Sequence, residues 1–469
     1  MKQRILTAAG VLALGGWLAA CDDFLSGPGL DTDPNRPSQA TIAQLYQGVQ
    51  VNSFVWFTGD LARVASMWNQ LMAGTGRQQQ TRDLYEVTEV DFDFDFSRIY
   101  TGGGLIDLRE IQRLAGESGD RTYAGIAKVW EAYKIGMAAS LWGDIPYSEA
   151  VGENPKPVLD DQAAVYAAVQ TLLNNAIADL QAAAGAGPGV LDQVYGGDRT
   201  KWIQAANTLK ARFYMHWVEA QLAGGASATR AATACGGNCL TAARTAALSG
   251  ISSAANDMRT FHTTTAGEQN LWFQFMNIAR QGDIAAGERL VELLKDRSDP
   301  RLEEYFAPVG SGQYIGAPPG TELTASQLNP AGRGAADFRQ PLVTYAENQL
   351  ILAEANYRLG AEGTALTHLN NARTSEGLAA LGALTGPALL TEIALEKYIA
   401  LFQNIEAWND HKRLCEPALT PAAGAAVLPG RLFYGEDERN TNPNIPSPGS
   451  ITDRNDNDPN PCPVPPGDS

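Results

Sequence analysis

The sequence predicts a mainly α-helical protein. Long stretches of the 469 residues repeat apolar side chains three or four positions apart, which is the spacing of one face of an α-helix. Short breaks with glycine or proline, such as GAGPG at residues 185–189, separate these stretches. Because each helix presents an apolar face, the helices are expected to pack against one another in an all-α assembly.

Residues 122–150 form the most regular stretch and join a helix to a polar corner. Gly143 supplies a C-terminal cap and Pro146 prevents the helix from resuming, so Asp144 and Tyr147 are expected at a helix end. On these grounds the corner is structural, with Asp144 as a capping carboxylate. The apolar face of this helix carries Ile126, Val129, Trp130, Tyr133, Met137 and Leu141.

The same periodicity predicts helices before and after this stretch. They are expected over residues 42–57, 60–72, 99–115, 160–184, 200–222, 288–295, 342–359, 363–374, 387–404 and 405–413. By contrast, residues 85–96 end in DFDFDF, whose alternation predicts an extended segment with Asp91, Asp93 and Asp95 on one side. These carboxylates are expected in solvent opposite buried phenylalanines, and a calcium site is the alternative.

The N-terminus has the anatomy of a lipoprotein signal. Lys2 and Arg4 precede an apolar run that is too short to span a bilayer, so residues 1–20 are expected to be a signal peptide. Small residues lead into Cys21, the expected site of lipidation, and a plain signal with an incidental cysteine is the alternative. Residues 21–40 are rich in Gly, Pro and Asp and are expected to form a lipidated tether. No other stretch is apolar enough to cross a membrane.

The charge of the chain excludes one class of partner. The formal net charge is −17, and removal of Lys2 and Arg4 with the signal would make it −19. Nucleic-acid binding requires clustered Lys and Arg, and no such cluster is present, so a neutral ligand is expected.

Four cysteines besides Cys21 are expected to form disulfides. Cys235 and Cys239 are separated by GGN, and glycine permits the tight turn that a small disulfide loop needs. Cys415 and Cys462 would then join the last helix to the proline-rich tail. A zinc site made from four scattered thiols is the less favoured alternative in an oxidising compartment.

Six segments resemble a known family and follow its usual order. They are LWGDIPYSEA, KPVLDDQAAVY, YGGDRTKWIQAANTLKARF, TYAENQLILAEA, EKYIALFQNIEAWNDHKR and RLFYGEDERN. Together they are similar to the SusD/RagB family of nutrient-binding outer-membrane lipoproteins, which includes starch-binding SusD-like proteins. The resemblance covers most of the chain. It implies tetratricopeptide-like helical hairpins packed with a loop-rich irregular subdomain.

The domain organisation combines this resemblance with local composition. We expect an N-terminal helical region over residues 41–255, a loop-rich ligand-binding subdomain over 256–340 and a C-terminal helical region over 341–415. A Pro/Asn/Asp-rich tail, 416–469, is expected to be an irregular surface segment. Residues 41–469 are expected to form one SusD-like unit.

The resemblance implies a glycan site built largely from the less regular subdomain. Sugar recognition needs flat apolar faces and planar polar groups, so exposed aromatic rings beside Asn or Arg are the expected chemistry. For each candidate the alternative is a packing role, because aromatic residues at helical spacing usually belong to a core. The candidates are Trp68, Asn69, Arg77, Trp272, Phe275, Asn277, Arg280 and Tyr314.

Signals for catalysis, cofactors and metals are absent from the sequence. The four histidines do not form HExxH, and no phosphate-binding loop, dinucleotide fingerprint or GxSxG motif occurs. Glu347 and Glu354 are seven residues apart, but acids on such a helix more often bind backbone or arginine, and Arg373 is an available partner. Binding without chemistry is therefore expected, with neither a cofactor nor a metal.

The expected function is that of a lipid-anchored protein on the outer membrane, facing the cell exterior. It would bind an oligosaccharide, or less favourably a peptide, and the resemblance implies delivery to a SusC-like TonB-dependent transporter for import. Two alternatives remain at this stage: a surface glycoside hydrolase, and a structural scaffold lipoprotein whose helices bind only protein.

Overall fold

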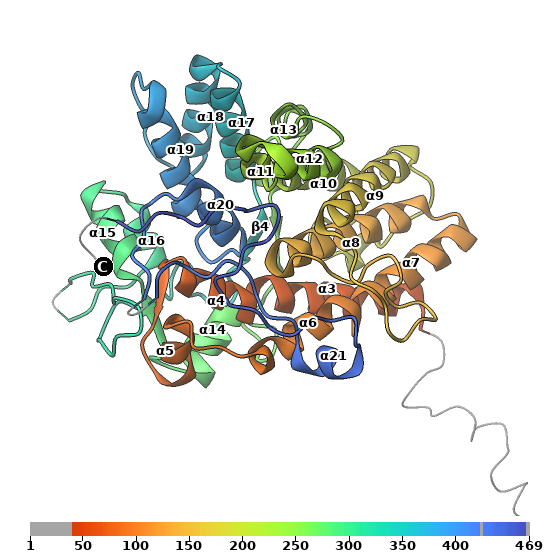
Figure 1. Cartoon of the computed structure of the whole chain (residues 1–469), viewed down its shortest axis with the longest axis horizontal. Coiled ribbons are helices and arrows are strands. Elements are labelled where there is room, and N and C mark those ends of the chain that lie inside the picture. The colour runs from red at the N-terminus through yellow and green to blue at the C-terminus, as the bar shows by residue number, and fades with distance from the viewer. Residues whose placement is uncertain (1–39, 311, 423–424, 466–469) are drawn as a thin grey trace, which may run out of the picture.

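Helices dominate the computed structural model, which describes residues 40–310, 312–422 and 425–465 (Figure 1). The prediction of a mainly helical fold is confirmed. The α-helices are α3 (Ile42–Thr58), α4 (Asp60–Trp68), α5 (Arg77–Asp83), α6 (Asp93–Tyr100), α7 (Leu105–Ser118), α8 (Arg121–Trp142), α9 (Gln162–Ala182), α10 (Arg199–Met215), α11 (Val218–Ala223), α12 (Gly225–Cys235), α13 (Cys239–Ala247), α14 (Leu271–Phe273), α15 (Glu288–Asp296), α16 (Arg301–Tyr305), α17 (Tyr345–Arg358), α18 (Glu362–Ser375), α19 (Gly386–Ala400), α20 (Glu406–Leu414) and α21 (Glu436–Thr441). Short 3₁₀ turns η1 (Glu89–Phe92), η2 (Gly189–Leu191) and η3 (Ala254–Asn256) and a π-helix, η4 (Gln274–Ala279), complete the helical elements.

Helix α8 lies at the centre of the packing. The Asp120 side chain caps its N-terminus by accepting a hydrogen bond from the Tyr123 amide at 3.0 Å. Almost every α8 side chain is buried, which is typical of a helix covered on all sides, and α3, α7, α9 and α10 all contact it. Gly143 ends the helix at φ 83°, and a β-carbon there would lie 2.6 Å from Asn455 Oδ1. Both the conformation and the close approach therefore require glycine.

Neighbouring helices pack in pairs on either side of α8. The α7–α8 and α17–α18 pairs form antiparallel hairpins joined by short connections, and α9 packs along α8 after a longer connection over residues 143–161 (Figure 1). In the α17–α18 pair, small side chains such as Ala353 and Ala365 are buried between the helices. These hairpins provide the rigid body against which the irregular segments are held.

Two small antiparallel sheets attach the loop-rich segment to the helices. Strand β1 (Met72–Gly74) pairs with β3 (Ile284–Ala286), and β2 (Met258–Arg259) pairs with β4 (Pro341–Val343). The first sheet joins the end of α4 to the segment before α15, although the two are more than two hundred residues apart in the chain. This pairing brings distant loops to one edge of the molecule.

The prediction of an extended segment over residues 85–96 is wrong. The chain there forms η1 and α6, with Phe92 and Phe96 buried together and Phe94 59% exposed on the opposite side. The three carboxylates accordingly do not share a face: Asp91 pairs with Arg82 at 3.2 Å, and Asp95 is buried.

Two predicted helices differ from the structure: one ends earlier than expected, and the other is divided in two. The helix predicted over 60–72 ends at Trp68, because the chain enters β1. The helix predicted over 200–222 divides into α10 and α11 around His216, whose Nε2 lies 2.8 Å from Glu406 Oε1.

The buried acids of α17 have cationic partners other than the predicted one. Arg212 donates to Glu347 at 2.5 Å, whereas Arg373 pairs with Glu392 and Glu396. Burial opposes ionisation of Glu354, but its ion pairs with Arg413, Lys397 and Arg358 outweigh that effect and hold its pKa well below the usual range. The acids of α17 therefore stabilise the C-terminal helices.

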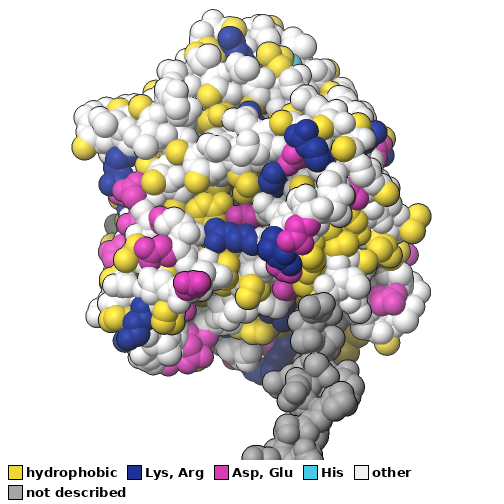
Figure 2. Space-filling view, turned by 90° about the vertical axis from the view of Figure 1, so that its right-hand side faces the viewer, with side chains coloured by type: hydrophobic (Ala, Val, Ile, Leu, Met, Phe, Trp, Pro, Cys, Tyr) yellow, Lys and Arg dark blue, Asp and Glu magenta, His cyan; other side chains and the backbone are white. Residues whose placement is uncertain are grey.

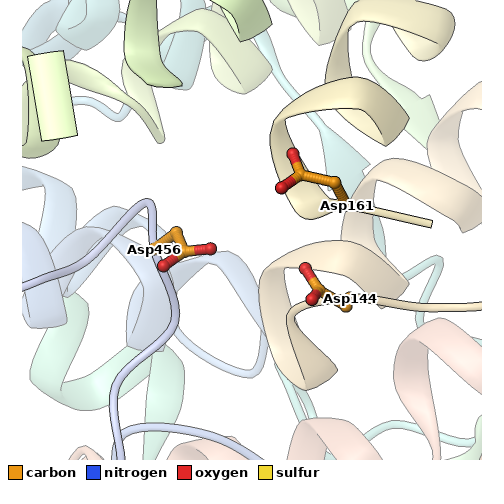
Figure 3. Close-up of side chains that lie close together, drawn as sticks. All are labelled: Asp144, Asp161 and Asp456. Carbon is orange, nitrogen blue, oxygen red and sulfur yellow. The ribbon is translucent and has the colours of Figure 1, made fainter. Parts of the chain in front are cut away.

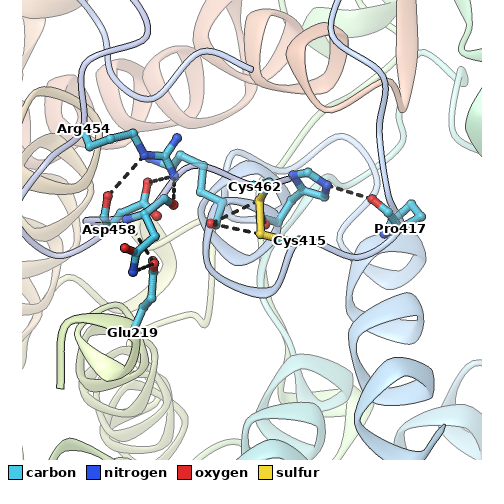
Figure 4. Close-up of a disulfide and its surroundings, with 9 residues drawn as sticks. Glu219, Cys415, Pro417, Arg454, Asp458 and Cys462 are labelled. Carbon is cyan, nitrogen blue, oxygen red and sulfur yellow. Dashed lines mark hydrogen bonds and ion pairs between the residues drawn. A yellow bond between two sulfur atoms is a disulfide. The ribbon is translucent and has the colours of Figure 1, made fainter. Parts of the chain in front are cut away.

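Both predicted disulfides are present. Cys235 bonds to Cys239 and Cys415 bonds to Cys462, with Cα separations of 5.2 Å in each case. The first closes the short loop between α12 and α13. The second joins the end of α20 to a segment close to the C-terminus (Figure 4).

The C-terminal tail is irregular and partly exposed, as expected, but several of its residues are buried, which corrects the prediction of a surface segment. Apart from α21 it lacks regular structure within the described residues, but Asn455, Asn457 and Asp458 are buried. Arg454 forms an ion pair with Asp458 at 2.6 Å, close to Glu219 of α11 (Figure 4). Asparagine and aspartate side chains provide the hydrogen bonds that this irregular backbone needs when it is buried.

The predicted signal peptide, Cys21 and the tether up to residue 39 lie outside the described residues. Within the described part, no helix combines the length and the apolar character needed to span a membrane. On the face shown in Figure 2, Lys and Arg side chains lie beside Asp and Glu and do not gather into one basic patch.

Candidate functional site

A groove of about 640 Å³ opens between three segments that the β1–β3 sheet brings together. Thr75 follows β1, the π-helix η4 and the turn after it contribute the second wall, and residues 309–327 contribute the third. The lining side chains and backbone come from Thr75, Met276, Asn277, Gln281, Gly282, Val309, Glu322, Leu323, Thr324, Ala325 and Gln327.

The β1 edge of the groove is fixed by contacts to the turn before β3. The amides of Thr75 and Gly76 donate to the Asp283 carbonyl oxygen, and the Thr75 hydroxyl donates to the Gly282 carbonyl oxygen at 2.8 Å. Arg77 adds an ion pair to the Asp283 carboxylate at 2.7 Å. The first two walls are therefore rigid relative to one another.

The second wall is a π-helix, a rare geometry that is frequently found at functional sites. Asn270 caps the preceding α14 by accepting hydrogen bonds from the Trp272 and Phe273 amides. The helix then widens, and the Arg280 amide donates to the Phe275 carbonyl oxygen at 2.7 Å. The wider turn leaves Asn277 and Arg280 exposed while Met276 stays buried.

A buried carboxylate holds the third wall in place. Asp83 Oδ2 accepts hydrogen bonds from the Gly74 amide at 2.8 Å and from the Gly320 amide at 2.9 Å. Its other oxygen has no hydrogen-bond partner among the described residues. Burial raises the pKa of Asp83 to about 7. Asp83 thus connects β1 to the loop that carries Glu322 and Thr324.

The chemistry of the lining is amide- and hydroxyl-rich. Asn277, Gln281 and Gln327 each contribute a planar amide that can donate and accept hydrogen bonds, and the Gln281 and Gln327 amides also donate to the Asn277 and Ala325 carbonyl oxygens. Glu322 is the single carboxylate among the described lining residues, whereas glycoside hydrolysis by the common mechanisms requires two facing carboxyl groups. The groove can therefore bind a neutral polyhydroxylated ligand, and its lining does not provide a hydrolytic pair.

The structure places one of the predicted site residues in the lining of this groove and two on the segments beside it. Asn277 lines it, and Arg77 and Arg280 belong to the two adjoining segments. Arg280 is exposed next to the groove but is not among its lining residues. Tyr314 follows the Val309–Gln313 bridge beside the groove but is half-buried against the core.

Four other candidates have structural roles. Trp68 and Trp272 are fully buried, and Trp68 Nε1 donates to the Arg82 carbonyl oxygen at 2.9 Å. Asn69 is also buried and donates to the Ala407 carbonyl oxygen at 3.1 Å. Phe275 carries the Arg63 guanidinium over its ring at 4.2 Å. The two indole rings and Asn69 are closed to solvent in this conformation, so we do not retain them as ligand contacts.

Sequence reasoning missed Asp83 and most of the lining. Gln281, Glu322 and Gln327 lie in loops without periodicity, and only the polar run TELTASQ after GAPPG distinguishes the third wall in the sequence. Nothing local in the sequence identifies Asp83 as a buried link, because its partners Gly74 and Gly320 are joined only by tertiary packing.

An acidic cluster elsewhere has a structural explanation. Asp144, Asp161 and Asp456 lie close together where α8, α9 and the C-terminal segment meet (Figure 3). Asp144 accepts a hydrogen bond from the Gln162 amide at 2.7 Å, and Arg230 forms ion pairs with Asp161 and Asp456. The cluster therefore joins α9, α12 and the tail.

The relationship of the chain to known proteins agrees with this architecture. A family model named SusD-like and described as starch-binding and associating with the outer membrane matches residues 34–435. The chain belongs to the SusD-like family. The predicted family is thereby confirmed, and the SusD-like match spans both the helical regions and the groove.

Solved structures share the SusD-like fold at low sequence identity. A chitin-binding protein is 21% identical with a TM-score of 0.73 and covers 90% of this chain and 100% of its own. A chitin-binding SusD homolog from Flavobacterium johnsoniae is 18% identical with a TM-score of 0.69, covering 89% of this chain and 95% of its own. A SusD/RagB family protein from Bacteroides thetaiotaomicron is 21% identical with a TM-score of 0.67, covering 87% and 95%. Among curated proteins, none matches the SusD-like chain significantly.

Proposed function

We propose that this SusD-like protein captures an oligosaccharide in the groove between Thr75, η4 and residues 309–327. The observation that carries the proposal is the lining itself, which combines amides and hydroxyls with the apolar side chains of Met276, Leu323 and Ala325. The family description as starch-binding and the two chitin-binding structures with this fold support a glycan as the ligand.

Capture would proceed by hydrogen bonding and apolar contact. The amides of Asn277 and Gln327 suit adjacent hydroxyl groups of a pyranose, because each amide offers a donor and an acceptor side by side. Leu323 is 43% exposed and presents an apolar surface to the C–H face of the sugar. Arg77 and Arg280 would contact ring or glycosidic oxygens at the mouth of the groove. A peptide is the alternative ligand, since the same amides pair with a peptide backbone.

The protein would act at the cell surface and hand its cargo to a transporter. In this proposal Cys21 carries the lipid anchor in the outer membrane, facing the exterior, and a SusC-like TonB-dependent barrel takes up the captured glycan. The transporter supplies the energy, and this chain performs no chemistry on its cargo. Co-purification of the chain with a TonB-dependent transporter tests the partnership. Failure to recover such a transporter cross-linked to the chain in membranes would count against the partnership.

Calorimetric titration of the purified full chain with malto- and chito-oligosaccharides tests the capture site. Replacing both Asn277 and Gln327 by alanine is expected to weaken binding about tenfold or more, because each lost hydrogen bond costs about 1 kcal/mol. Asn175→Ala, which removes an exposed amide from α9, is the matched control and should leave affinity unchanged.

Three results would overturn the capture proposal. They are equal loss of affinity in the Asn175→Ala control, unchanged affinity in the double variant, and binding of a peptide with no glycan bound. Analysis of the recovered oligosaccharide for shortened products tests the absence of chemistry. Cleavage by the wild-type chain would select the hydrolase alternative.

A further inference from the structure

A second pocket, of about 820 Å³, lies between α6, α21 and the segment over residues 146–157. It shares no lining residue with the groove. Helices α6 and α21 lie together at the lower edge of the molecule in Figure 1, although they come from opposite ends of the described chain. Nothing in the proposed capture mechanism uses this pocket.

Specific contacts hold the walls of this pocket in place. The Asp437 amide donates to Asp93 Oδ1 at 3.1 Å, and a β-carbon on Gly435 would lie 2.8 Å from the same oxygen. Arg439 forms two hydrogen bonds to the Glu89 carboxylate, at 2.5 and 2.9 Å, which attach α21 to η1. Asn442 donates to the Pro157 carbonyl oxygen at 2.9 Å and fixes the third wall. The pocket is therefore formed before any ligand arrives.

The pocket carries negative charge without a lining cation. Asp93, Asp437 and Glu438 line it, and none of its described lining residues is Lys, Arg or His. Of the neighbouring cations, Arg439 binds Glu89 outside the pocket, whereas the Arg98 guanidinium lies over one face of the lining Phe94 ring at 3.9 Å and leaves only the rest of that ring to a ligand. Such a site favours a positively charged ligand.

The same pocket also offers apolar faces and hydroxyl groups. Phe94 is 59% exposed, and Phe96, Tyr100 and three prolines add further apolar wall. The Tyr100 hydroxyl is buried and has no hydrogen-bond partner among the described residues, and Ser97 lines the wall beside it. A metal ion would leave the rings unused, so the lining fits a ligand with a charge, an apolar face and hydroxyl groups together.

We propose that this pocket binds a cationic amino sugar, such as a glucosamine unit whose amine is free. The ammonium group would contact Asp437 and Glu438, the C–H face of the ring would pack on Phe94, and the hydroxyls would bond to Tyr100 and Ser97. This site is independent of the groove, so the chain would carry two sugar sites of different charge preference.

Titration of the full chain with a glucosamine tetrasaccharide, and with its fully N-acetylated counterpart, tests the proposal. The free-amine form is expected to bind at least about tenfold more tightly, because a hydrogen bond to a charged group contributes about 1.5–3 kcal/mol. Asp437→Asn should remove most of that preference. Glu436→Gln changes the charge by the same amount on the same helix, outside the lining, and should retain the preference.

Further experiments distinguish this site from the groove and from a peptide-binding site. The Asn277→Ala, Gln327→Ala double variant should keep the preference for the free amine even where neutral-glycan binding is lost. Equal binding of the two tetrasaccharides, or unchanged preference in Asp437→Asn, would overturn the proposal. Tighter binding of a lysine-containing tetrapeptide than of the amino sugar would overturn it as well. Phe94→Leu should weaken the amino sugar and leave the fold intact, because Phe94 is exposed.

Discussion

Asp83 is a buried carboxyl group that fixes one wall of the groove through two backbone hydrogen bonds. Its pKa is raised from 3.8 to about 7 by burial, so the folded chain binds more protons than the unfolded chain between these values. The contribution of Asp83 to stability is therefore fully present below pH 3.8 and is lost as the pH rises towards 7. Ionised Asp83 lowers the free energy of unfolding, but its carboxylate positions the backbone amides of Gly74 and Gly320.

Asp83→Asn should raise the free energy of unfolding at pH 8 and have little effect at pH 4. The asparagine oxygen can still accept from Gly74 and Gly320, and the buried charge is gone. We expect a gain of about 1–3 kcal/mol at pH 8, since one unit of pKa shift corresponds to about 1.4 kcal/mol. Urea unfolding of the wild type and the variant at pH 4 and pH 8 measures this difference in the free energy of unfolding.

Glu153→Gln is the control for Asp83→Asn, because it makes a comparable change at an exposed loop position. It should not alter the pH dependence. A less stable Asp83→Asn protein at pH 8 would show that the carboxylate has a partner that the asparagine cannot replace.

At the residue scale, the polar candidates and the tryptophan candidates lie in different surroundings. Asn277, Arg77 and Arg280 are exposed beside the groove, since their side chains are costly to bury without partners. Trp68 and Trp272 are in the core, because a large apolar ring at helical spacing gains most from burial. Composition alone does not distinguish a ring that binds sugar from one that packs.

At the scale of elements, helices with clear stop signals were predicted well. The helix that ends at Gly143 and the α9 helix that begins after Asp161 follow local capping rules. The prediction for residues 85–96 is wrong because DFDFDF fits both the two-residue period of a strand and the 3.6-residue period of a helix over so short a stretch. Burial of Phe92 against Trp68 and of Phe96 against Trp142 and Tyr434 decides for the helix, and these contacts depend on tertiary packing. The π-helix η4 leaves no comparable signal in the sequence.

The two disulfides close loops of different size and should differ in their effect on stability. In the chain-entropy model a loop of 47 residues corresponds to about 4 kcal/mol and a loop of 4 residues to about 2 kcal/mol. Replacing Cys415 and Cys462 by alanine should therefore destabilise the protein about twice as much as replacing Cys235 and Cys239. Guanidinium unfolding of the two double variants measures the difference, and equal losses would contradict the model here.

At the scale of the whole molecule, the tail completes the core around α8. The Leu432 amide donates to the Leu141 carbonyl oxygen at 2.9 Å, and Asn455 donates to the Ser140 carbonyl oxygen at 3.1 Å. The composition of this tail, which is rich in Pro, Asn and Asp, predicts a surface loop. Its burial depends on hydrogen bonds to residues about three hundred positions earlier, which local composition does not encode.

Removing residues from Gly430 onwards should lower Tm by about 10 °C or more. The deletion exposes the ends of α8 and α20 and leaves buried carbonyl groups without donors, each at a cost of about 1–3 kcal/mol. Replacing only Cys415 and Cys462 is the control, because it unlinks the tail and keeps its packing. A truncated chain with unchanged Tm would show that the tail does not contribute to the core. Thermal unfolding followed by circular dichroism distinguishes these results.

The contact between Leu432 and Leu141 also has a consequence for folding during synthesis. The Leu432 amide is made about three hundred residues after the Leu141 carbonyl group that it pairs with, so this hydrogen bond can form only when the chain is nearly complete. Helices ahead of it can pack earlier, because folding during synthesis starts from the N-terminal side, and the tail then closes the end of α8 last.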